Sequence, residues 1–243
     1  MKKHHVSDAR PSSPTPHAPP PSSSPQTRWS WSTESVYMDA REERLAAWTH
    51  ALGIPLGLMV VAVAMGGKLP GELFLAAMAL GISTMLLYFC SMMSHAVFDP
   101  VKRNRWRAFD QAAIYLMIVA TYTPYACRAL HGTEQSLFLM ILWVLGLSGA
   151  VMKVVLQHRI NAISTVSYLL LGWLPAIPLA PLTPAPLLGW MALGGILYTA
   201  GVPFLLGSHH RPLAHTLWHL FVLAGTFAHL YPILTLSILA PDG

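Results

Sequence analysis

The chain has 243 residues, of which 54% are hydrophobic and only 10% are charged, whereas about a quarter of the residues in a typical soluble domain are charged. This composition excludes an ordinary soluble domain and predicts an integral membrane protein. The formal net charge of +5 is therefore interpreted as a charge bias among loops. It does not indicate a nucleic-acid-binding surface, because no nucleic-acid motif accompanies it.

The N-terminal segment 1–36 is rich in proline and serine, as in 11–16 and 19–21, and has almost no aliphatic residues. A segment of this composition cannot bury a hydrophobic core, so we expect a disordered tail. Residues 37–243 are predicted to form a single transmembrane domain.

Seven apolar segments follow the tail, and each is close to the ~20 residues that a helix needs to cross the hydrocarbon core. The fifth is expected to kink or end early because it contains Pro175, Pro178 and Pro181. The predicted fold is therefore all-α, with seven transmembrane helices over 45–66, 72–95, 110–130, 136–156, 163–181, 186–206 and 214–239.

Lysine and arginine concentrate at the loops on one side of the predicted bundle. The opposite loops hold only Lys68 and Arg128. The positive-inside rule then places the N-terminus in the cytosol and the C-terminus outside, in the inner or plasma membrane of the cell. The positions assigned to the cytosolic side are Arg41, Arg44, Lys102, Arg103, Arg105, Arg107, Lys153, Arg159 and Arg211.

Four ionisable residues fall inside apolar segments and, on this topology, in the same leaflet. His95 ends the second segment, Asp110 begins the third, and His215 and His219 begin the seventh, one helical turn apart on one face. Ionisable groups within a membrane are costly and mark functional sites. Three neutral imidazoles and a water would form a four-coordinate zinc site with one reactive position. Asp110 and Ser91, one turn before His95, would lie beside it. A metal-free polar network is the alternative.

Other polar residues receive less specific interpretations. Glu42 and Glu43 are predicted to be a solvated helix start, where acidic groups favour the helix dipole. Lys153 is predicted to sit in a loop near anionic lipid. His50 is expected to form a hydrogen bond between packed helices, with a place behind the metal site as the alternative. His229 is expected to bond a neighbouring helix or to line a polar cavity.

Four motifs stand out in residues 41–240. They are Glu42-Glu43 through Thr49-His50, Ser91-x-x-x-His95, Asp110 through Tyr115 leading to Thr121–Pro124, and His215-x-x-x-His219. Together they resemble the motifs of the hemolysin III family, the bacterial branch of the progestin and adipoQ receptor superfamily. Ala46 stands where relatives usually have Asn, and Gln111 where they usually have His. The resemblance implies seven helices with a cytosolic N-terminus, zinc held by the three histidines, and a water-holding role for Asp110.

The leading functional hypothesis is a zinc-dependent hydrolase of lipid amide or ester bonds near the cytosolic leaflet, as relatives of the ceramidase type imply. Asp110 would act as general base, and Ser91 would orient the water or stabilise the oxyanion. Its partner would be a membrane lipid. A metal-stabilised receptor or sensor without turnover is the alternative. A pore-forming protein ranks last, because the outer half of the predicted bundle is nearly all apolar.

Overall fold

The computed structural model describes residues 40–155, 162–208 and 213–239, and all regular structure in these ranges is helical. The predicted disordered tail lies outside the described residues. The elements are α1 (Ala40–Ala51), α2 (Gly53–Met65), α3 (Gly71–Ala96), α4 (Pro100–Ala129), α5 (Gly132–Val155), α6 (Ala162–Trp173), α7 (Ala176–Leu179), η1 (Ala180–Leu182), α8 (Ala185–Leu206), α9 (Ala214–Leu234) and η2 (Ser237–Leu239).

Six helical stretches among the described residues are long and apolar enough to cross a membrane. They are Arg41–Met65, Gly71–Ala96, Gly132–Val155, Thr165–Leu182, Ala185–Leu206 and Ala214–Leu234. The remaining long helix, α4, has 30 residues but is much more polar. The prediction of an all-helical, multi-spanning chain is thus confirmed for six of the seven segments.

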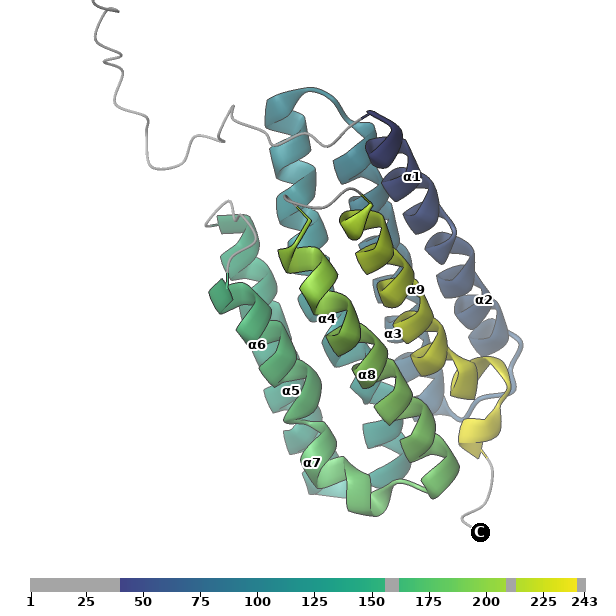
Figure 1. Ribbon diagram of the computed structural model, residues 1–243. Coiled ribbons are helices and arrows are strands. Elements are labelled where there is room, and N and C mark those ends of the chain that lie inside the picture. The colour runs from purple at the N-terminus through teal and green to yellow at the C-terminus, as the bar shows by residue number, and fades with distance from the viewer. Residues whose placement is uncertain (1–39, 156–161, 209–212, 240–243) are drawn as a thin grey trace, which may run out of the picture. The chain divides into compact units, whose positions relative to one another are not determined.

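The helices pack as a bundle in which the first helix, α1, contacts the last long helix, α9. Helix α1 contacts both α3 and α9, while α3 packs on α4, and α8 packs on α9 (Figure 1). Helix α6 joins α4 to α8, and α5 packs against α4. This arrangement brings the end of α3 and the start of α9 next to the start of α1, although they are far apart in sequence.

Two helix boundaries differ from the predicted ones for local reasons. Helix α4 begins at Pro100 rather than at 110, because the Asp99 side chain accepts the Lys102 N–H at 2.8 Å and Pro100 occupies a first-turn position. The fifth segment breaks as predicted: α6 ends at Trp173, and the proline-containing α7 and η1 follow.

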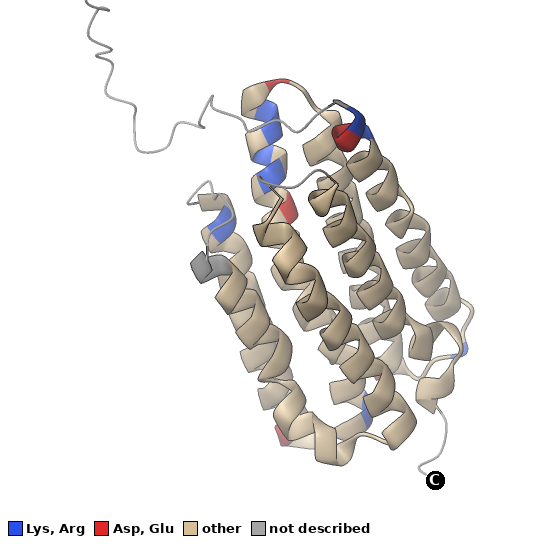
Figure 2. Ribbon diagram, in the orientation of Figure 1, with Lys and Arg blue, Asp and Glu red and all other residues tan. Residues whose placement is uncertain are grey.

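Charged residues gather at one end of the bundle. Figure 2 shows lysine and arginine along the first turns of α4 and near the start of α1, with tan, uncharged helix over most of the remaining length. The outward faces carry large exposed apolar side chains, such as Leu75 and Ile177. In a membrane these faces contact lipid, so the exposed apolar surface needs no further partner.

Candidate metal centre

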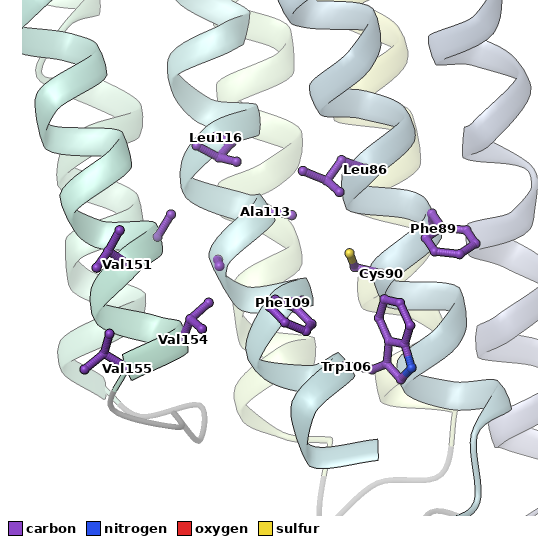
Figure 3. Close-up of a pocket in the computed structure, with 12 residues that line it drawn as sticks. Leu86, Phe89, Cys90, Trp106, Phe109, Ala113, Leu116, Val151, Val154 and Val155 are labelled. Atoms are coloured by element: carbon purple, nitrogen blue, oxygen red, sulfur yellow. The ribbon is translucent and has the colours of Figure 1, made fainter. Parts of the chain in front are cut away.

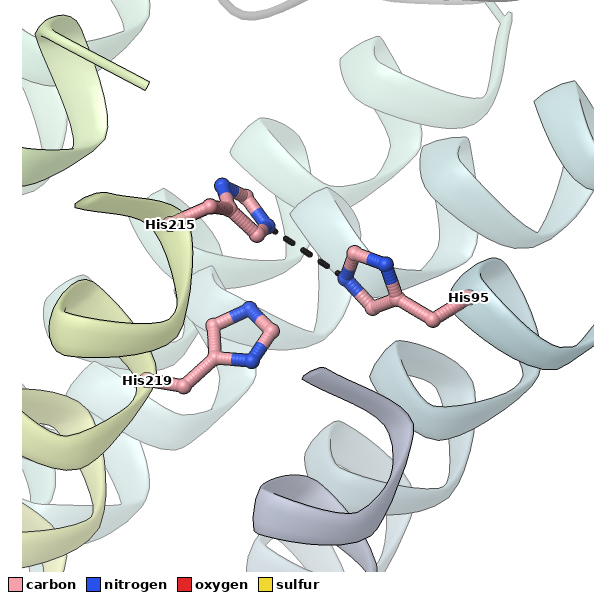
Figure 4. A group of neighbouring side chains, drawn as sticks. All are labelled: His95, His215 and His219. Atoms are coloured by element: carbon pink, nitrogen blue, oxygen red, sulfur yellow. Dashed lines mark hydrogen bonds between the residues drawn. The ribbon is translucent and has the colours of Figure 1, made fainter. Parts of the chain in front are cut away.

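Three histidines converge where the end of α3 meets the start of α9. His95 lies in the last turn of α3, and His215 and His219 lie in the first turns of α9. One ligand atom of each lies within 4.8 Å of the others (Figure 4). The His95 and His215 Nε2 atoms are 3.3 Å apart, close to the roughly 3.3 Å between two nitrogens that bind one tetrahedral zinc at ~2.05 Å. The histidines are therefore positioned to hold a metal ion.

The neighbours of His95 fix which of its nitrogens faces the cluster. Its Nδ1 lies 2.8 Å from Glu43 Oε2. The same carboxylate accepts from Arg103 Nη1 at 2.9 Å and pairs with Nη2 at 2.9 Å. A carboxylate paired with arginine is ionised and only accepts, so His95 Nδ1 carries the proton. The unprotonated Nε2 is left for a metal, in the carboxylate–histidine–metal arrangement.

His219 is oriented in a comparable way by Thr49. The Thr49 hydroxyl donates to the Ala46 carbonyl at 2.9 Å, and its oxygen lies 3.3 Å from His219 Nδ1. With its hydrogen used, this oxygen can only accept from Nδ1, so His219 Nε2 is unprotonated. Two of the three rings thus present a free Nε2 lone pair. Such an all-imidazole donor set suits zinc and other transition metals rather than magnesium or calcium.

The prediction of a solvated helix start is wrong for Glu43, which is 1% exposed. Its partner Arg103, assigned to a cytosolic loop, is fully buried. Arg103 also donates to the Val97 and His95 carbonyls at 2.9 and 3.1 Å, which satisfies backbone groups at the end of α3. The adjacent Glu42 accepts the N–H of Leu213, at the start of α9, at 2.7 Å. The first turn of α1 therefore contacts both helices that carry the histidines.

Ser91 lies on α3 one turn before His95, and it contacts Asp110 of α4. The Ser91 hydroxyl donates to Asp110 Oδ2 at 3.1 Å, and Ser91 is buried while Asp110 is partly exposed. The structure thus brings these two predicted catalytic residues into contact. Their catalytic roles, like the ligand roles of the histidines, stay predictions.

Sequence reasoning missed that the polar interior extends past the histidines. Tyr88 donates to Thr226 Oγ1 at 2.8 Å, and Tyr198 lies 2.8 Å from the same oxygen, which links α3, α9 and α8. A heptad-like spacing of polar residues in apolar helices could have revealed it, because such positions share one helix face. These residues are Thr84, Tyr88, Ser91 and His95 in α3, and His215, His219, Thr226 and His229 in α9.

His50 and His229 are both buried, and the hydrogen bond expected for His50 is not observed among the described residues. The His50 ring lies 3.6 Å from the His219 ring, centroid to centroid, and neither of its nitrogens has a partner among the described residues. His229 stacks on Tyr198 with centroids 5.6 Å apart, and its Nδ1 also lacks a partner there. Gly194 leaves room for the His229 ring, since a Cβ at that position would meet it.

The prediction of a lipid-facing loop lysine is wrong for Lys153, which is 3% exposed. Its Nζ donates to Gln111 Oε1 at 3.0 Å and lies 5.6 Å from the centroid of the Tyr168 ring. Tyr168 in turn donates to the Gln111 carbonyl at 3.1 Å. Lys153 therefore joins α5 to α4 and α6 near Asp110, because Gln111 is the next residue of α4. The flanking Arg159 lies outside the described residues.

An apolar groove of about 520 Å³ runs between α3, α4 and α5 (Figure 3). Small buried side chains, including Cys90, Ala113 and Ala150, line its depth, and its exposed borders are large and apolar. Cys90 immediately precedes Ser91, and Phe109 immediately precedes Asp110. The groove therefore lies at the same level of α3 and α4 as the predicted catalytic pair, although neither Ser91 nor Asp110 lines it. The border residues are Leu86, Phe89, Phe109, Val151 and Val155.

Comparisons with known proteins agree with the motif resemblance. A family model described as haemolysin-III related matches residues 38–230. The Hemolysin-3 homolog of Bacillus subtilis (strain 168) is 33% identical over 208 residues, which cover 83% of this chain and 97% of that protein. Hemolysin-3 of Bacillus cereus is 32% identical over 192 residues, 76% of this chain and 87% of that protein.

A more distant relative fits the wider superfamily. The monocyte to macrophage differentiation factor of Homo sapiens is 28% identical over 124 residues, 51% of this chain and 52% of that protein. The extent of the family match and the near-complete coverage of the Bacillus subtilis protein identify the family. The chain belongs to the haemolysin-III-related family of membrane proteins.

Proposed function

We propose that the protein is a zinc-dependent hydrolase of lipid amide or ester bonds, with its site near the cytosolic leaflet. The observation that carries this proposal is the group of three imidazoles within 4.8 Å of one another, backed by the buried Glu43 carboxylate. Three-histidine sites with a position open to water are typical of catalytic zinc, whereas structural zinc sites are usually closed by four protein ligands.

The roles of the chain's own residues follow from their contacts. A bound zinc ion would supply Lewis acidity, which acidifies water toward pKa ~7 and polarises a carbonyl. Glu43 holds the His95 ring in the tautomer that can bind a metal. Asp110 takes the proton of the attacking water and returns it to the leaving amine or alcohol as the carbon–nitrogen or carbon–oxygen bond breaks. Ser91 orients Asp110 through its 3.1 Å hydrogen bond.

A lipid substrate suits the surroundings of this site. The groove between α3, α4 and α5 is lined by apolar residues and opens on the outer surface of the bundle, and its lining residues Cys90 and Phe109 are the chain neighbours of Ser91 and Asp110. An acyl chain lying in this groove would bring its carbonyl to the polar end of the bundle. Aqueous substrates would have no comparable reason to approach along a membrane-facing surface.

We also propose that α4 crosses the membrane as the third of seven spans and that the histidine end of the bundle is cytosolic. Of the residues of α4, 15 are buried, including Gln111 and Thr121. The helix can cross the membrane inside the bundle because its polar side chains meet protein rather than lipid. The gathering of Lys and Arg at the end where α4 begins (Figure 2) supports a cytosolic assignment under the positive-inside rule.

A metal-stabilised receptor without turnover is the second candidate, and one observation favours it. The three histidines come from two helices, α3 and α9, so a bound ion would tie these helices together and contribute to folding as structural ions do. On this reading a protein group would fill the fourth coordination position, and no water would be available for chemistry.

The test is the metal content of detergent-purified protein, measured by mass spectrometry for the wild type and for His215→Ala. About one zinc per chain is expected in the wild type, from the single three-ligand site, and little in the variant. Purified protein would then be offered long-chain amides and esters. A folded, metal-free wild type would refute the proposal, and stoichiometric zinc without any hydrolysis would favour the receptor.

A further inference from the structure

His50 is a buried histidine whose hydrogen-bonding capacity is unmet. It is 3% exposed, and neither Nδ1 nor Nε2 has a partner among the described residues. A neutral imidazole offers one donor and one acceptor. Leaving both unsatisfied in a buried position is costly, and native structures avoid it unless a water, an ion or a ligand completes the bonds. This group therefore calls for a partner that the described residues do not supply.

The surrounding side chains hold the His50 ring in place. The Tyr88 ring meets it edge-on, with centroids 5.2 Å apart. Tyr88 is fixed by its 2.8 Å hydrogen bond to Thr226 and by its close contact with Gly53, where a Cβ would meet the tyrosine ring. The His219 ring lies 3.6 Å from the His50 ring, centroid to centroid. The His50 ring thus packs against two other buried rings, as a preorganised binding group would.

The neighbouring histidines are oriented by other residues. His95 Nδ1 bonds Glu43, and His219 Nδ1 faces Thr49. His50 packs on His219, which lies one turn further along α9 than His215. A group that bonds His50 would therefore lie next to His219, at the edge of the cluster.

We propose that His50 is a positioning residue that hydrogen-bonds an oxygen of the lipid carbonyl or carboxylate bound at the three-histidine cluster. This assignment rests on the proposed function and extends it, because it names the group that aligns the acyl end of the substrate. One oxygen would face the cluster and the other His50. The carboxylate released by amide or ester hydrolysis offers both oxygens, so a fatty acid is a suitable probe.

The experiment measures dodecanoate binding to cobalt-substituted protein in detergent, followed by the visible absorption of the metal. His50→Phe keeps an aromatic ring in the stack but removes both nitrogens. We expect its dodecanoate Kd to rise about tenfold, as for the loss of one hydrogen bond to a charged group, with cobalt affinity unchanged. His50→Gln, which retains a donor, should recover part of the loss. His229→Phe is the matched control, because it removes another buried imidazole with an unmet nitrogen away from the cluster, and should leave both affinities unchanged.

Several results would overturn the assignment. If His50→Phe loses cobalt as His215→Ala is expected to, then His50 is a metal ligand. If the dodecanoate Kd of the variant is within twofold of the wild-type Kd, then His50 only packs against its neighbours. The same conclusion follows if the wild type does not bind dodecanoate. His50→Met provides the same comparison if the phenylalanine variant does not fold. Dodecanoate binding that depends on His50, in a protein that hydrolyses no amide or ester, would support the assignment and refute the hydrolase alone.

Discussion

Replacing Glu43 by glutamine should weaken metal binding and destabilise the fold by two separable routes. The Glu43 carboxylate accepts from His95 Nδ1 at 2.8 Å and pairs with Arg103 at 2.9 Å. Glutamine has nearly the same shape but no charge. It makes the His95 ring a weaker ligand and removes the Glu43 charge from beside the buried guanidinium.

The two effects have different sizes. Loss of the group behind a metal-binding histidine typically costs 10–100-fold in metal affinity, which corresponds to about 1.4–2.7 kcal/mol. Glutamine retains a carbonyl oxygen that can accept from His95, so we expect a value near the lower end. Removing one partner of a buried ion pair costs about 3–5 kcal/mol of stability. That range applies here because Glu43 and Arg103 are 1% and 0% exposed.

Metal affinity would be measured by competition with a chromophoric chelator, and stability by denaturant titration in mixed micelles. Glu42→Gln is the matched control, because it removes a charge one residue away and keeps the acceptor for the Leu213 N–H. The double variant Glu43→Leu/Arg103→Met removes the whole pair, so it should be more stable than Glu43→Gln yet still bind metal weakly. Wild-type metal affinity in Glu43→Gln would show that the carboxylate serves the fold alone.

Three further variants test other parts of the site. Asp110→Asn should lower the rate of lipid hydrolysis by about 10²–10⁴-fold without changing metal content; an active variant would remove Asp110 as the base. Ala150→Phe should fill the groove and raise KM for long-chain substrates while leaving KM for short-chain esters unchanged. Equal effects on both substrates would exclude the groove as the binding site of the acyl chain. Gln111→Leu removes an acceptor from the buried Lys153 ammonium and should lower the free energy of unfolding by about 1–3 kcal/mol, measured by denaturant titration. Gln111→Glu keeps an acceptor and should not lower the free energy of unfolding. Equal stability of the two variants would contradict this role of Gln111.

The positions of the histidines could be predicted because membrane physics limits the alternatives. An imidazole in an apolar helix is expensive wherever it lies, so His95, His215 and His219 stand out in sequence. Segment lengths then place all three at the same depth. The structure brings their ligand atoms within 4.8 Å of one another, because α3 and α9 turn these faces toward each other and the 3.6-residue helical period puts His215 and His219 on one face.

The buried positions of three charged residues could not be predicted in the same way. Glu43, Arg103 and Lys153 lie near helix ends, where a charged side chain can equally reach solvent or turn inward. Helix rotation decides between the two outcomes, and it depends on packing across the bundle rather than on local sequence. Helix α4 was likewise predicted to begin at 110, because four basic residues and an asparagine interrupt the apolar pattern over its first ten residues. The Asp99 cap and Pro100 start the helix before that pattern begins.

The two consecutive glutamates at the start of α1 have a thermodynamic consequence. Glu42 holds the backbone at the start of α9, and Glu43 holds His95 and Arg103, so α1 is docked to both histidine-bearing helices. Docking of α1 and occupancy of the cluster are then linked equilibria, and each must strengthen the other by the same factor. A force or a binding partner acting on the chain just before α1 would therefore change how tightly an ion is held, without touching any of its ligands.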